Sequence, residues 1–314
     1  MTIVRYIIHN LWLLDLFFLL VVPLLVMLVG WKRRRKAALL LTVLMVGTYL
    51  YGRYVGTARL EVRRVQLSFA DLPEAFDGYR LVHVSDLHAG SITHDLLRRV
   101  VDSINAQKAD MVVFTGDMQN VEPRELEPLL PLLKRLKARD GVCSVLGNHD
   151  YGDYAYADDF ERTENIGRLM YLQEEMGWHV LANEHRKIRR GSQRLVIGGM
   201  ENDGEGRFPQ RGDIGSTLNG VRRSDFVIML EHDPTSWRRK ILPHCHAQLT
   251  LSGHTHGGQL ALFGWSPASL RYREYEGAYC LSGRYLYVTK GLSGAIPFRL
   301  GASPEIVVIE LKKL

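Results

Sequence analysis

The sequence predicts an α/β protein, a four-layer α/β/β/α sandwich that follows an N-terminal helical hairpin. Three observations indicate this fold. Two apolar segments, residues 6–30 and 37–55, open the chain; strand-like runs alternate with helix-patterned segments between residues 79 and 146; and strand-like runs dominate the second half. Strands joined by helices pair in parallel and need helices on their faces. We therefore expect two packed sheets with helices outside.

The first apolar segment is long enough to cross a hydrocarbon core, and the second is just long enough. A cleaved signal peptide is the alternative. It fits less well, because the segment is too long for a signal core and no small-residue cleavage site follows it. We predict a transmembrane hairpin anchor over residues 1–56 and a single domain over residues 57–314.

A basic cluster at residues 31–36 (WKRRRK) joins the two apolar segments. Short basic loops stay in the cytoplasm, so both ends of the hairpin and the domain are expected on the opposite side. Four arginines after the second segment favour the reverse orientation: Arg53, Arg59, Arg63 and Arg64. Polar residues in the first segment (His9, Asn10 and Asp15) have either a functional role or a helix-pairing or interfacial one, and we favour the second.

The formal net charge of +6 comes largely from the basic residues that flank the hairpin. This charge favours lipid headgroups over nucleic acid as the partner. The three cysteines (Cys143, Cys245 and Cys280) form neither a disulfide framework nor a zinc-ribbon spacing. No sequence feature specifies an oligomeric state.

The predicted elements of the first half alternate in type. Strands are expected at residues 79–85, 109–115 and 141–146, and helices at 93–107 and 123–138. The first helix has a continuous apolar face. Pro128 and Pro131 are expected to delay or kink the second.

The second half adds further predicted strands, at residues 195–199, 226–230, 247–251, 259–263, 285–289 and 306–311. In open α/β sheets, ligands bind beyond the carboxyl ends of the strands. The loops that follow these strands are therefore the places to seek a site.

Five of those strand ends carry side chains that bind metals. The residues, in chain order, are Asp86, His88, Asp117, Asn148, His149, Asp150, His232, His254 and His256. Each alone has an ordinary explanation as a helix cap, a turn residue or a surface histidine; together they predict a site for two divalent ions. Carboxylate and amide oxygens mixed with imidazole suit manganese, iron or zinc, and ions about 3.5–4 Å apart share a carboxylate and clamp a phosphate.

The spacing of the ligands suggests how the backbone presents them. In Asp86-x-His88 and His254-x-His256, alternation along an extended backbone places both side chains on one side. The glycines beside the second pair allow the backbone to approach the ions and the substrate closely.

The set resembles the five-motif signature of the calcineurin-like metallophosphoesterases over nearly all of residues 80–311. Its motifs here are Asp86-x-His88, Gly116-Asp117, Gly147-Asn148-His149-Asp150, His232 and Gly253-His254-Thr255-His256. The continuation Gly257-Gly258-Gln259 and a late segment are similar to the bacterial membrane-associated branch typified by YkuE and YaeI. The late segment comprises Gly291-Leu292-Ser293-Gly294, Pro297, Arg299 and Pro304-Glu305.

The resemblance implies a role for each motif residue. One metal would be held by Asp86, His88 and His256, and the other by Asn148, His232 and His254, with Asp117 as the bridge. His149 would stand near the leaving group, and Asp150 would orient it by a hydrogen bond. Many relatives carry an aspartate where this chain has Asn120, a position that is not a ligand in the family. Arg299 is expected either to clamp a phosphate or to pair with Glu305.

Other histidines are expected to lie outside the ligand set. His83 alternates with apolar residues in a predicted strand and is expected to pack. His94 is expected to lie away from the metals, although the loop before it could bring it near. His244 and His246 look like ligands, but a partly buried cluster that binds no metal is the favoured interpretation.

The predicted function is that of a membrane-anchored, dinuclear-metal-dependent phosphoesterase in which a metal-bridging hydroxide attacks phosphorus. Phosphodiesters and pyrophosphates, lipid-linked ones in particular, are the expected substrates, and the hairpin implies the bacterial inner membrane with a periplasmic domain. The first alternative is UDP-2,3-diacylglucosamine pyrophosphatase activity with a cytoplasmic site. A non-catalytic metal-binding scaffold is the alternative of another class. A nuclease is disfavoured, because the chain has a membrane hairpin and lacks a separate DNA-binding region.

Overall fold

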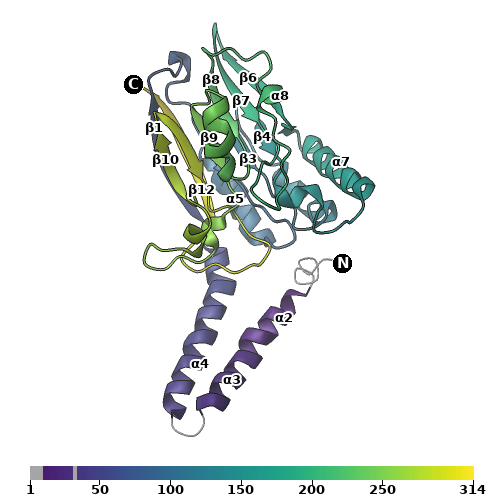
Figure 1. Cartoon of the computed structure of the whole chain (residues 1–314), viewed down its shortest axis with the longest axis vertical. Coiled ribbons are helices and arrows are strands. Elements are labelled where there is room, and N and C mark those ends of the chain that lie inside the picture. Colours follow the sequence, from purple (N-terminus) through teal and green to yellow (C-terminus); the bar gives the residue numbers. More distant parts are fainter. Residues whose placement is uncertain (1–9, 31–33) are drawn as a thin grey trace.

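The computed structural model describes residues 10–30 and 34–314, so His9 and residues 31–33 of the predicted basic loop lie outside the described residues. The hairpin begins with α2 (Leu11–Leu16), which continues through a π-helical turn into α3 (Val22–Gly30). The second arm is α4 (Arg35–Leu50). Figure 1 shows α4 projecting from the domain and α2 and α3 forming the other arm, with the end of α3 and the start of α4 farthest from the domain.

Both arms have the length and composition of membrane-spanning helices. Within the described residues, Leu11–Leu28 has a mean hydropathy of 2.7, and Arg35–Ala58 has a mean hydropathy of 1.4 over its most apolar window. Asp15 is a polar residue of the first arm, and its carboxylate accepts a hydrogen bond from the Tyr49 hydroxyl and lies 3.5 Å from Arg53 Nε. Asp15 therefore pairs the two arms, as we favoured from the sequence.

The domain contains two six-stranded sheets among the described residues. The first has the order β1-β12-β2-β3-β4-β5, with strands β1 (Glu61–Phe69), β2 (Arg80–Val84), β3 (Met111–Thr115), β4 (Val142–Val145), β5 (His179–Val180) and β12 (Glu305–Lys313). The second has the order β10-β11-β9-β8-β7-β6, with strands β6 (Glu184–Arg190), β7 (Gln193–Gly199), β8 (Phe226–Leu230), β9 (Leu249–Ser252), β10 (Gly277–Leu281) and β11 (Arg284–Val288).

The strands that lead into the predicted ligand loops are parallel within each sheet. β2, β3 and β4 pair in parallel, with Val82 opposite Val112 and Val112 opposite Val142. In the second sheet, β8 and β9 are parallel neighbours, with Leu230 opposite Leu251. Their carboxyl ends therefore open at one edge of each sheet, which is where ligand loops gather in α/β folds.

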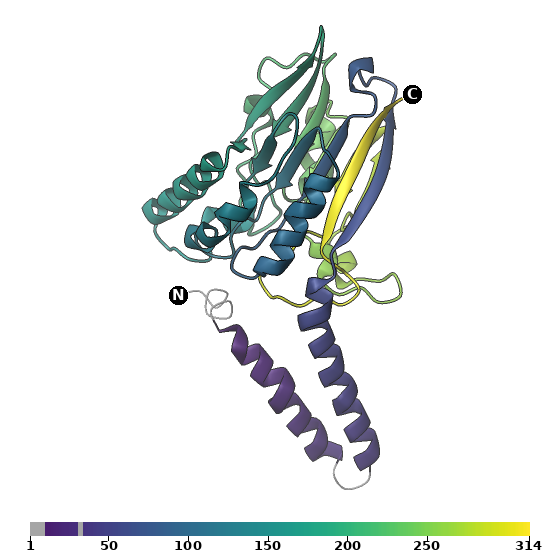
Figure 2. The same ribbon diagram turned by 180° about the vertical axis from the view of Figure 1, so that it is seen from behind.

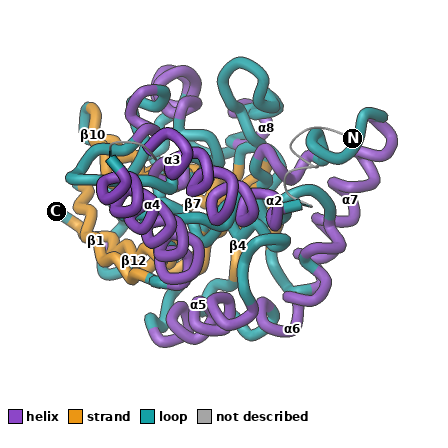
Figure 3. Tube along the Cα trace, turned by 90° about the horizontal axis from the view of Figure 1, so that it is seen from below, coloured by secondary structure: helices purple, strands orange, loops and turns teal. Residues whose placement is uncertain are grey.

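Apolar residues fill three layers and confirm the predicted sandwich. Leu81 and Val113 of the first sheet pack against Ile228 of the second in the middle layer. The amphipathic helix α5 (His94–Ala106) covers the outer face of the first sheet (Figure 2), together with the helices near α7 (Asp159–Glu175). Trp237 begins the short helical segment that covers the second sheet. In the view from below, α2, α3 and α4 lie in front of the strands, and α5 and α7 lie beside them (Figure 3).

The predicted helix at residues 123–138 is wrong in its extent. The segment forms two 3₁₀ turns, Pro123–Glu125 and Glu127–Leu129, and only then the short α6 (Leu130–Leu133). Pro128 and Pro131 have no backbone N–H to donate, so a regular helix cannot run through them.

The predicted strand at residues 259–263 is also wrong. In this described stretch, Leu260 and Leu262 make isolated bridges and no named strand forms. Gln259 has φ 57° and Phe263 has φ 51°, and left-handed residues break the extended ladder. Conversely, β1, β6, β10 and α7 lie in segments for which no element was predicted.

The hairpin joins the domain through a close glycine contact. After α4, a π-helical turn (Tyr51–Val55) and a 3₁₀ turn (Gly56–Ala58) lead into β1, and the predicted boundary between residues 56 and 57 falls in the second turn. The Arg299 N–H donates to the Gly52 carbonyl over 3.0 Å. A Cβ on Gly56 would lie 1.8 Å from the Arg299 carbonyl oxygen, so the backbones pack directly against each other.

Candidate metal centre

The loops that follow β2, β3, β4, β8 and β9 bring all the predicted ligands into one buried cluster. Asp86, His88 and His256 form one group, in which one ligand atom of each lies within 4.8 Å of those of the other two. Asp86 Oδ1 lies 3.8 Å from His256 Nε2. Asp86 and His88 are fully buried, and the His256 side chain is 17% exposed, so this group faces an opening.

A second group forms beside the first. Asn148 Oδ1 lies 2.7 Å from His254 Nδ1 and 3.2 Å from His232 Nε2, and the two nitrogens are 3.2 Å apart. Three potential ligand atoms thus converge on one point from three different loops.

Asp117 lies between the two groups. Its Oδ2 is 3.3 Å from His232 Nε2 and 3.6 Å from His88 Nε2. Its Oδ1 accepts a hydrogen bond from the His149 N–H over 2.9 Å, which fixes the carboxylate. One oxygen of Asp117 is therefore within reach of both groups, as a bridging carboxylate requires.

In His88 and His232, a hydrogen bond at Nδ1 determines that Nε2 is the ring nitrogen available to a metal. His88 Nδ1 faces Asn120 Oδ1 at 2.8 Å, and His232 Nδ1 faces the Thr115 carbonyl at 2.6 Å. Oxygens of these kinds only accept, so both Nδ1 atoms carry a proton, and the Nε2 atoms are the ones that face the centre of the cluster. Within the described residues, His88 Nε2 and His256 Nδ1 are buried without a hydrogen-bond partner. Orphaned imidazole nitrogens beside carboxylates fit a bound divalent metal.

The ligands are not presented on extended backbone, and the predicted strand-like alternation is wrong. Asp86 (φ 53°), His88 (φ 46°), Asp117 (φ 58°), His254 (φ 69°) and His256 (φ 53°) all lie in the left-handed region. Side chains other than glycine rarely adopt this region, and its concentration in one place is typical of functional sites. The left-handed backbone, and not an extended strand, therefore brings both side chains of each pair, Asp86 with His88 and His254 with His256, to the cluster.

Burial sets the electrostatics of the cluster. It raises the pKa of Asp86 to about 7 and lowers the pKa of His88 to about 3 and that of His254 to about 4. For Asp117, burial would raise the pKa, but the charges of His232 and His149 hold it well below its usual range. Burial disfavours the charged forms of these groups when no cation is present. Divalent ions bound among them would offset that desolvation cost.

The ring of His149 lies beside His88 of the first group, and its Nδ1 is bonded outside that group. Its Nδ1 donates to the Asn120 carbonyl over 2.7 Å, and its ring packs edge-on to His88 at 4.8 Å and against Tyr154 at 4.4 Å. The carbonyl fixes the proton on Nδ1, which leaves Nε2 to interact with a substrate.

Asp150 does not contact the ring of His149 as predicted. Its carboxylate accepts hydrogen bonds from four backbone N–H groups, at 2.8–3.2 Å; the donors are Gly147, Asp117, Met118 and Gln119. Because these donors belong to the loops after β3 and β4, Asp150 fixes one loop against the other and thereby positions Asp117 and Asn148. Its first-turn position in the Asn148–Tyr151 segment makes these bonds geometrically available.

Arg299 also has partners other than those expected. Its side chain is 1% exposed, and the guanidinium donates to the carbonyls of Ala302 and Lys290, each at 2.9 Å, and to that of Ser293. Within the described residues, the ion pairs of Glu305 are formed with Arg63 and Lys290. The donors of Arg299 thus hold the 290–302 loop together rather than reaching toward a phosphate.

Three residues at the centre were not predicted to take part. Asn120 contacts both His88 and His149, Tyr272 places its hydroxyl 3.0 Å from His254 Nε2, and Asp233 Oδ2 lies 3.4 Å from the same nitrogen. The adjacency of Asp233 to His232 and the position of Asn120 after Asp117 were the available sequence signals; Tyr272 had none.

Four further histidines, all within the described residues, lie outside the cluster. His83 is buried, and its Nε2 pairs with Thr115 Oγ1 at 2.8 Å. His94 begins α5 on the surface, and His246 Nε2 contacts the Asp225 carbonyl at 3.2 Å. His244 ends a short helix away from the ligand loops.

Comparison with known proteins gives consistent relatives. The sequence profile of the family described as calcineurin-like phosphoesterase matches residues 79–258. The chain is 31% identical over 275 residues to the uncharacterized metallophosphoesterase YkuE of Bacillus subtilis, covering 85% of this chain and 90% of that protein. It is 28% identical to an uncharacterized metallophosphoesterase of Aquifex aeolicus, covering 86% of this chain and 97% of that protein.

A vertebrate protein is similar as well. The chain is 31% identical to a Danio rerio transmembrane protein with metallophosphoesterase domain, covering 84% of this chain. The chain spans 60% of the length of that relative.

Proposed function

The chain belongs to the calcineurin-like phosphoesterase family, in its YkuE-like branch, and is a metal-dependent phosphoesterase; from this premise we propose that its centre holds two divalent metal ions. One ion is assigned to Asp86, His88 and His256. The second is assigned to Asn148, His232 and His254, with Asp117 as the bridge. The observation that carries the proposal is the position of Asp117 Oδ2, 3.3 Å from His232 Nε2 and 3.6 Å from His88 Nε2, between two groups of converging ligand atoms.

Bound divalent ions supply a Lewis acid for a phosphoryl oxygen and lower the pKa of a coordinated water. The protein side chains position the substrate and the ligand loops. The Nδ1–H of His149 donates to the Asn120 carbonyl, so the second proton of the imidazolium form, on Nε2, is assigned as the donor to the phosphoryl or leaving oxygen. Asp150 and Asn120 keep the loops and His88 in place. The mixed oxygen and nitrogen donors favour manganese, iron or zinc.

The proposed substrates are phosphodiesters or pyrophosphates, with lipid-linked esters favoured. The hairpin supports this choice, because two apolar helices inserted in a bilayer would bring the centre close to lipid headgroups. We further propose that residues 1–56 anchor the chain in the bacterial inner membrane, as a two-span protein with residues 57–314 on the periplasmic side.

Sidedness has a direct test. An alkaline phosphatase fusion and a fluorescent protein fusion after Leu314 report the periplasm and the cytoplasm, respectively. We expect the alkaline phosphatase fusion to be active and the fluorescent protein fusion to be non-fluorescent. The reverse result would overturn the periplasmic assignment and favour the nucleotide-linked lipid pyrophosphatase alternative, whose substrate is cytoplasmic.

The metal assignment is tested with the full-length chain and an Asp117→Asn variant. Metal content and hydrolysis of bis(p-nitrophenyl) phosphate are measured with manganese, zinc and iron. We expect the variant to lose more than about a hundredfold in activity, since even residues that only support ligands contribute about 10–100-fold. Asp95→Asn, at an exposed ion pair with Arg98, is the matched control.

Near-normal turnover of Asp117→Asn would refute the dinuclear assignment. Stoichiometric metal with no hydrolysis of any phosphoester by the wild-type chain would instead favour the non-catalytic scaffold.

A further inference from the structure

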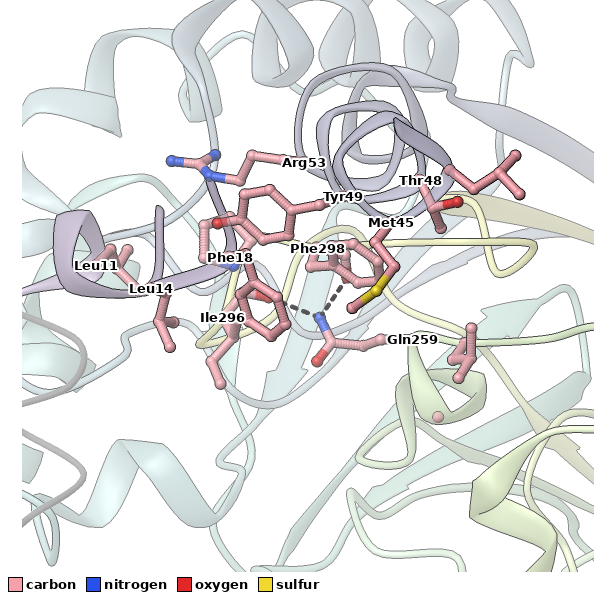
Figure 4. Close-up of a pocket in the computed structure, with 14 residues that line it drawn as sticks. Leu11, Leu14, Phe18, Met45, Thr48, Tyr49, Arg53, Gln259, Ile296 and Phe298 are labelled. Atoms are coloured by element: carbon pink, nitrogen blue, oxygen red, sulfur yellow. Dashed lines mark hydrogen bonds between the residues drawn. The ribbon is translucent and has the colours of Figure 1, made fainter. Parts of the chain in front are cut away.

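A cavity of about 710 Å³ lies between the hairpin and the domain (Figure 4). Cavities that bind small ligands usually enclose about 300–1,000 Å³. Both arms of the hairpin contribute walls, and two loops of the domain close the other side. The wall residues that matter here are Leu14, Phe18, Met45, Gln259, Ile296 and Phe298.

Most of the wall residues are apolar, and the position of the cavity in the hairpin indicates which apolar molecules can reach it. Leu14 and Phe18 belong to the first helical stretch that can cross a membrane, and Met45 belongs to the second. The same cavity is lined by loop residues of the domain, Gln259 and Phe298, so these parts of the two arms face the domain. In a membrane-inserted hairpin, the cavity therefore lies at the domain-side edge of the hydrocarbon layer, where lipid tails are the abundant apolar solute.

Aromatic stacking joins the three walls. The rings of Phe18 and Tyr49 stack with centroids 4.8 Å apart, and the rings of Tyr49 and Phe298 stack at 6.1 Å. This series runs from the first arm through the second to a loop of the domain (Figure 4). The cavity is thus bounded by packed side chains that connect the hairpin to the domain.

The two loops that close the cavity also hold the metal centre. The Gln259 N–H donates to the His256 carbonyl over 3.1 Å, and its side-chain amide donates to the carbonyls of Ile296 and Phe298. Earlier in the second loop, the Ser293 N–H donates to the Asp86 carbonyl over 2.9 Å. A molecule in the cavity therefore lies against the same two loops that place Asp86 and His256.

The cavity has a polar end. Among the described residues that line it, Arg53 is the one with a charged side chain, and Asp15 holds its guanidinium at 3.5 Å. This polar end is thus an ion pair that joins the two arms, whereas the walls around Leu14, Phe18 and Met45 are apolar.

We propose that this cavity binds the hydrocarbon tail of a membrane lipid whose phosphoester headgroup enters the metal centre. The headgroup chemistry rests on the proposed function, whereas tail binding rests on the cavity itself. The substrate class is then a phosphoester that carries a long alkyl or prenyl tail and is drawn directly from the bilayer.

Photocrosslinking tests tail binding without any requirement for activity. The full-length chain is reconstituted in phosphatidylcholine nanodiscs, stripped of metal with EDTA and illuminated with a phosphatidic acid that carries a diazirine at the end of one tail. We expect crosslinks on residues 258–260 and 296–298. These residues belong to loops of the domain, so a tail reaches them by occupying the cavity.

A tryptophan at Met45 should fill the cavity and compete with the tail. Excluding two or three methylenes lowers affinity about tenfold or more, so crosslinking of both loops should fall by about that factor in Met45→Trp. Leu41→Trp is the control, because Leu41 lies one helical turn earlier, is 49% exposed and is not a wall residue. Equal melting temperatures of the two variants exclude misfolding as the cause.

Crosslinks confined to outward-facing residues of the hairpin such as Leu24 and Leu40, with both loops unlabelled, would overturn the proposal. An unchanged yield in Met45→Trp would do the same. A protein segment seated in the cavity would exclude the lipid and give the first of these results.

A pair of chromogenic diesters separates this proposal from the proposed function. 4-Nitrophenyl hexadecyl phosphate and 4-nitrophenyl ethyl phosphate share the reacting group and differ only in the tail. We expect the manganese-loaded chain to prefer the hexadecyl ester in kcat/KM and Met45→Trp to reduce that preference about tenfold. Hydrolysis of both esters with no tail preference would refute tail binding. Hydrolysis of neither by the metal-loaded chain would refute the diesterase proposal, and crosslinking would then decide tail binding.

Discussion

The Nδ1–H of His88 donates to the side-chain oxygen of Asn120 over 2.8 Å, so one neutral amide fixes the tautomer of a proposed metal ligand. The backbone carbonyl of the same residue accepts from His149 Nδ1 over 2.7 Å. Its side-chain N–H₂ donates to Ser91 Oγ. Asn120 thus connects the proposed ligand His88 with His149, which is assigned to the phosphoryl or leaving oxygen, although Asn120 binds no metal in the assignment.

This contact predicts the effect of changing Asn120. Leucine has a similar shape but no acceptor, so Asn120→Leu should free the His88 ring and weaken metal binding about 10–100-fold. Asn120→Asp keeps an acceptor and should stay within a few-fold of the wild type. Competition with a chelator, followed by metal analysis, measures both. Asn105→Leu is the matched control, because the half-buried Asn105 amide at the end of α5 also makes hydrogen bonds, to Arg135 and Lys137, but contacts no proposed ligand. Wild-type affinity in Asn120→Leu would show that the amide does not support the ligand.

A second prediction concerns Gly291, which lies against Asp86. Gly291 has φ 71°, and a Cβ there would lie 2.6 Å from the Cβ of Asp86. Gly283 has φ 74° but no atom within 4 Å of such a Cβ. Gly283→Ala therefore bears only the strain of the left-handed backbone, roughly 1–2 kcal/mol, whereas Gly291→Ala must also displace Asp86.

We expect both variants to lower the melting temperature and only Gly291→Ala to lose metal and most of the phosphodiesterase activity. Calorimetry and metal analysis on the same samples distinguish the two effects. Equal metal content in the two variants would argue against close packing of Gly291 on a ligand.

The fold and the ligand set could be predicted to different depths. The apolar face of α5 is local, and its predicted bounds of 93–107 lie within one residue of the observed His94–Ala106. The edge strand β6 (Glu184–Arg190) was not predicted, because it is rich in arginine and only one of its residues is buried. The helix α7 was not predicted for a similar reason: few of its residues are buried, and two of those, Asn165 and Gln173, are polar.

The site shows the same division. Residue types at strand ends are a local signal, and these side chains do meet in the fold. The left-handed backbone at Asp86 and His254 was not predictable from alternation, because an alternating pattern assumes an extended backbone. The role of Asp150 depends on N–H groups about thirty residues earlier in the chain, and Tyr272 reaches His254 from a segment with no motif. Long-range contacts of this kind leave no periodic trace in sequence.

A third prediction uses two glycines of the second arm. A Cβ on Gly56 would lie 1.8 Å from the Arg299 carbonyl oxygen, whereas one on Gly47 would meet nothing within 4 Å. Gly47→Ala should be neutral or slightly stabilising, by up to about 1 kcal/mol, because alanine favours helix more than glycine does. Gly56→Ala should force the hairpin away from the 298–299 backbone and lower the melting temperature of the full-length chain in detergent.

Limited proteolysis between the hairpin and β1 provides a second measurement. Faster cleavage in Gly56→Ala and unchanged cleavage in Gly47→Ala are the expected results. Indistinguishable behaviour of the two variants would mean that the hairpin is not locked to the domain at this contact.

The last prediction is a pH dependence of stability far from the metal centre. Asp225 is buried at the start of β8, and its carboxylate accepts hydrogen bonds from Arg194 Nε at 2.7 Å and from the second guanidinium nitrogen at 2.8 Å. Burial would raise the pKa of Asp225, but the Arg194 hydrogen bonds outweigh it and lower the pKa. A carboxyl group whose pKa is lower in the folded state stabilises the fold above its unfolded pKa of about 3.9. That contribution is lost as the pH falls through the lower, folded value.

Asp225→Asn should therefore be less stable than the wild type at pH 7, by about 1–3 kcal/mol for hydrogen bonds to a charged group. The difference should shrink as the pH falls below about 4, because the unfolded chain then binds a proton at Asp225 that the folded state, with its lower pKa, does not yet bind. Thermal melts of the full-length chain between about pH 3.5 and 7 measure it. Asp102→Asn, at the half-exposed pair with Arg135, is the control and should change little at any pH. A gap between Asp225→Asn and the wild type that stayed constant with pH would show that the lost stability comes from packing, and not from the charge of Asp225.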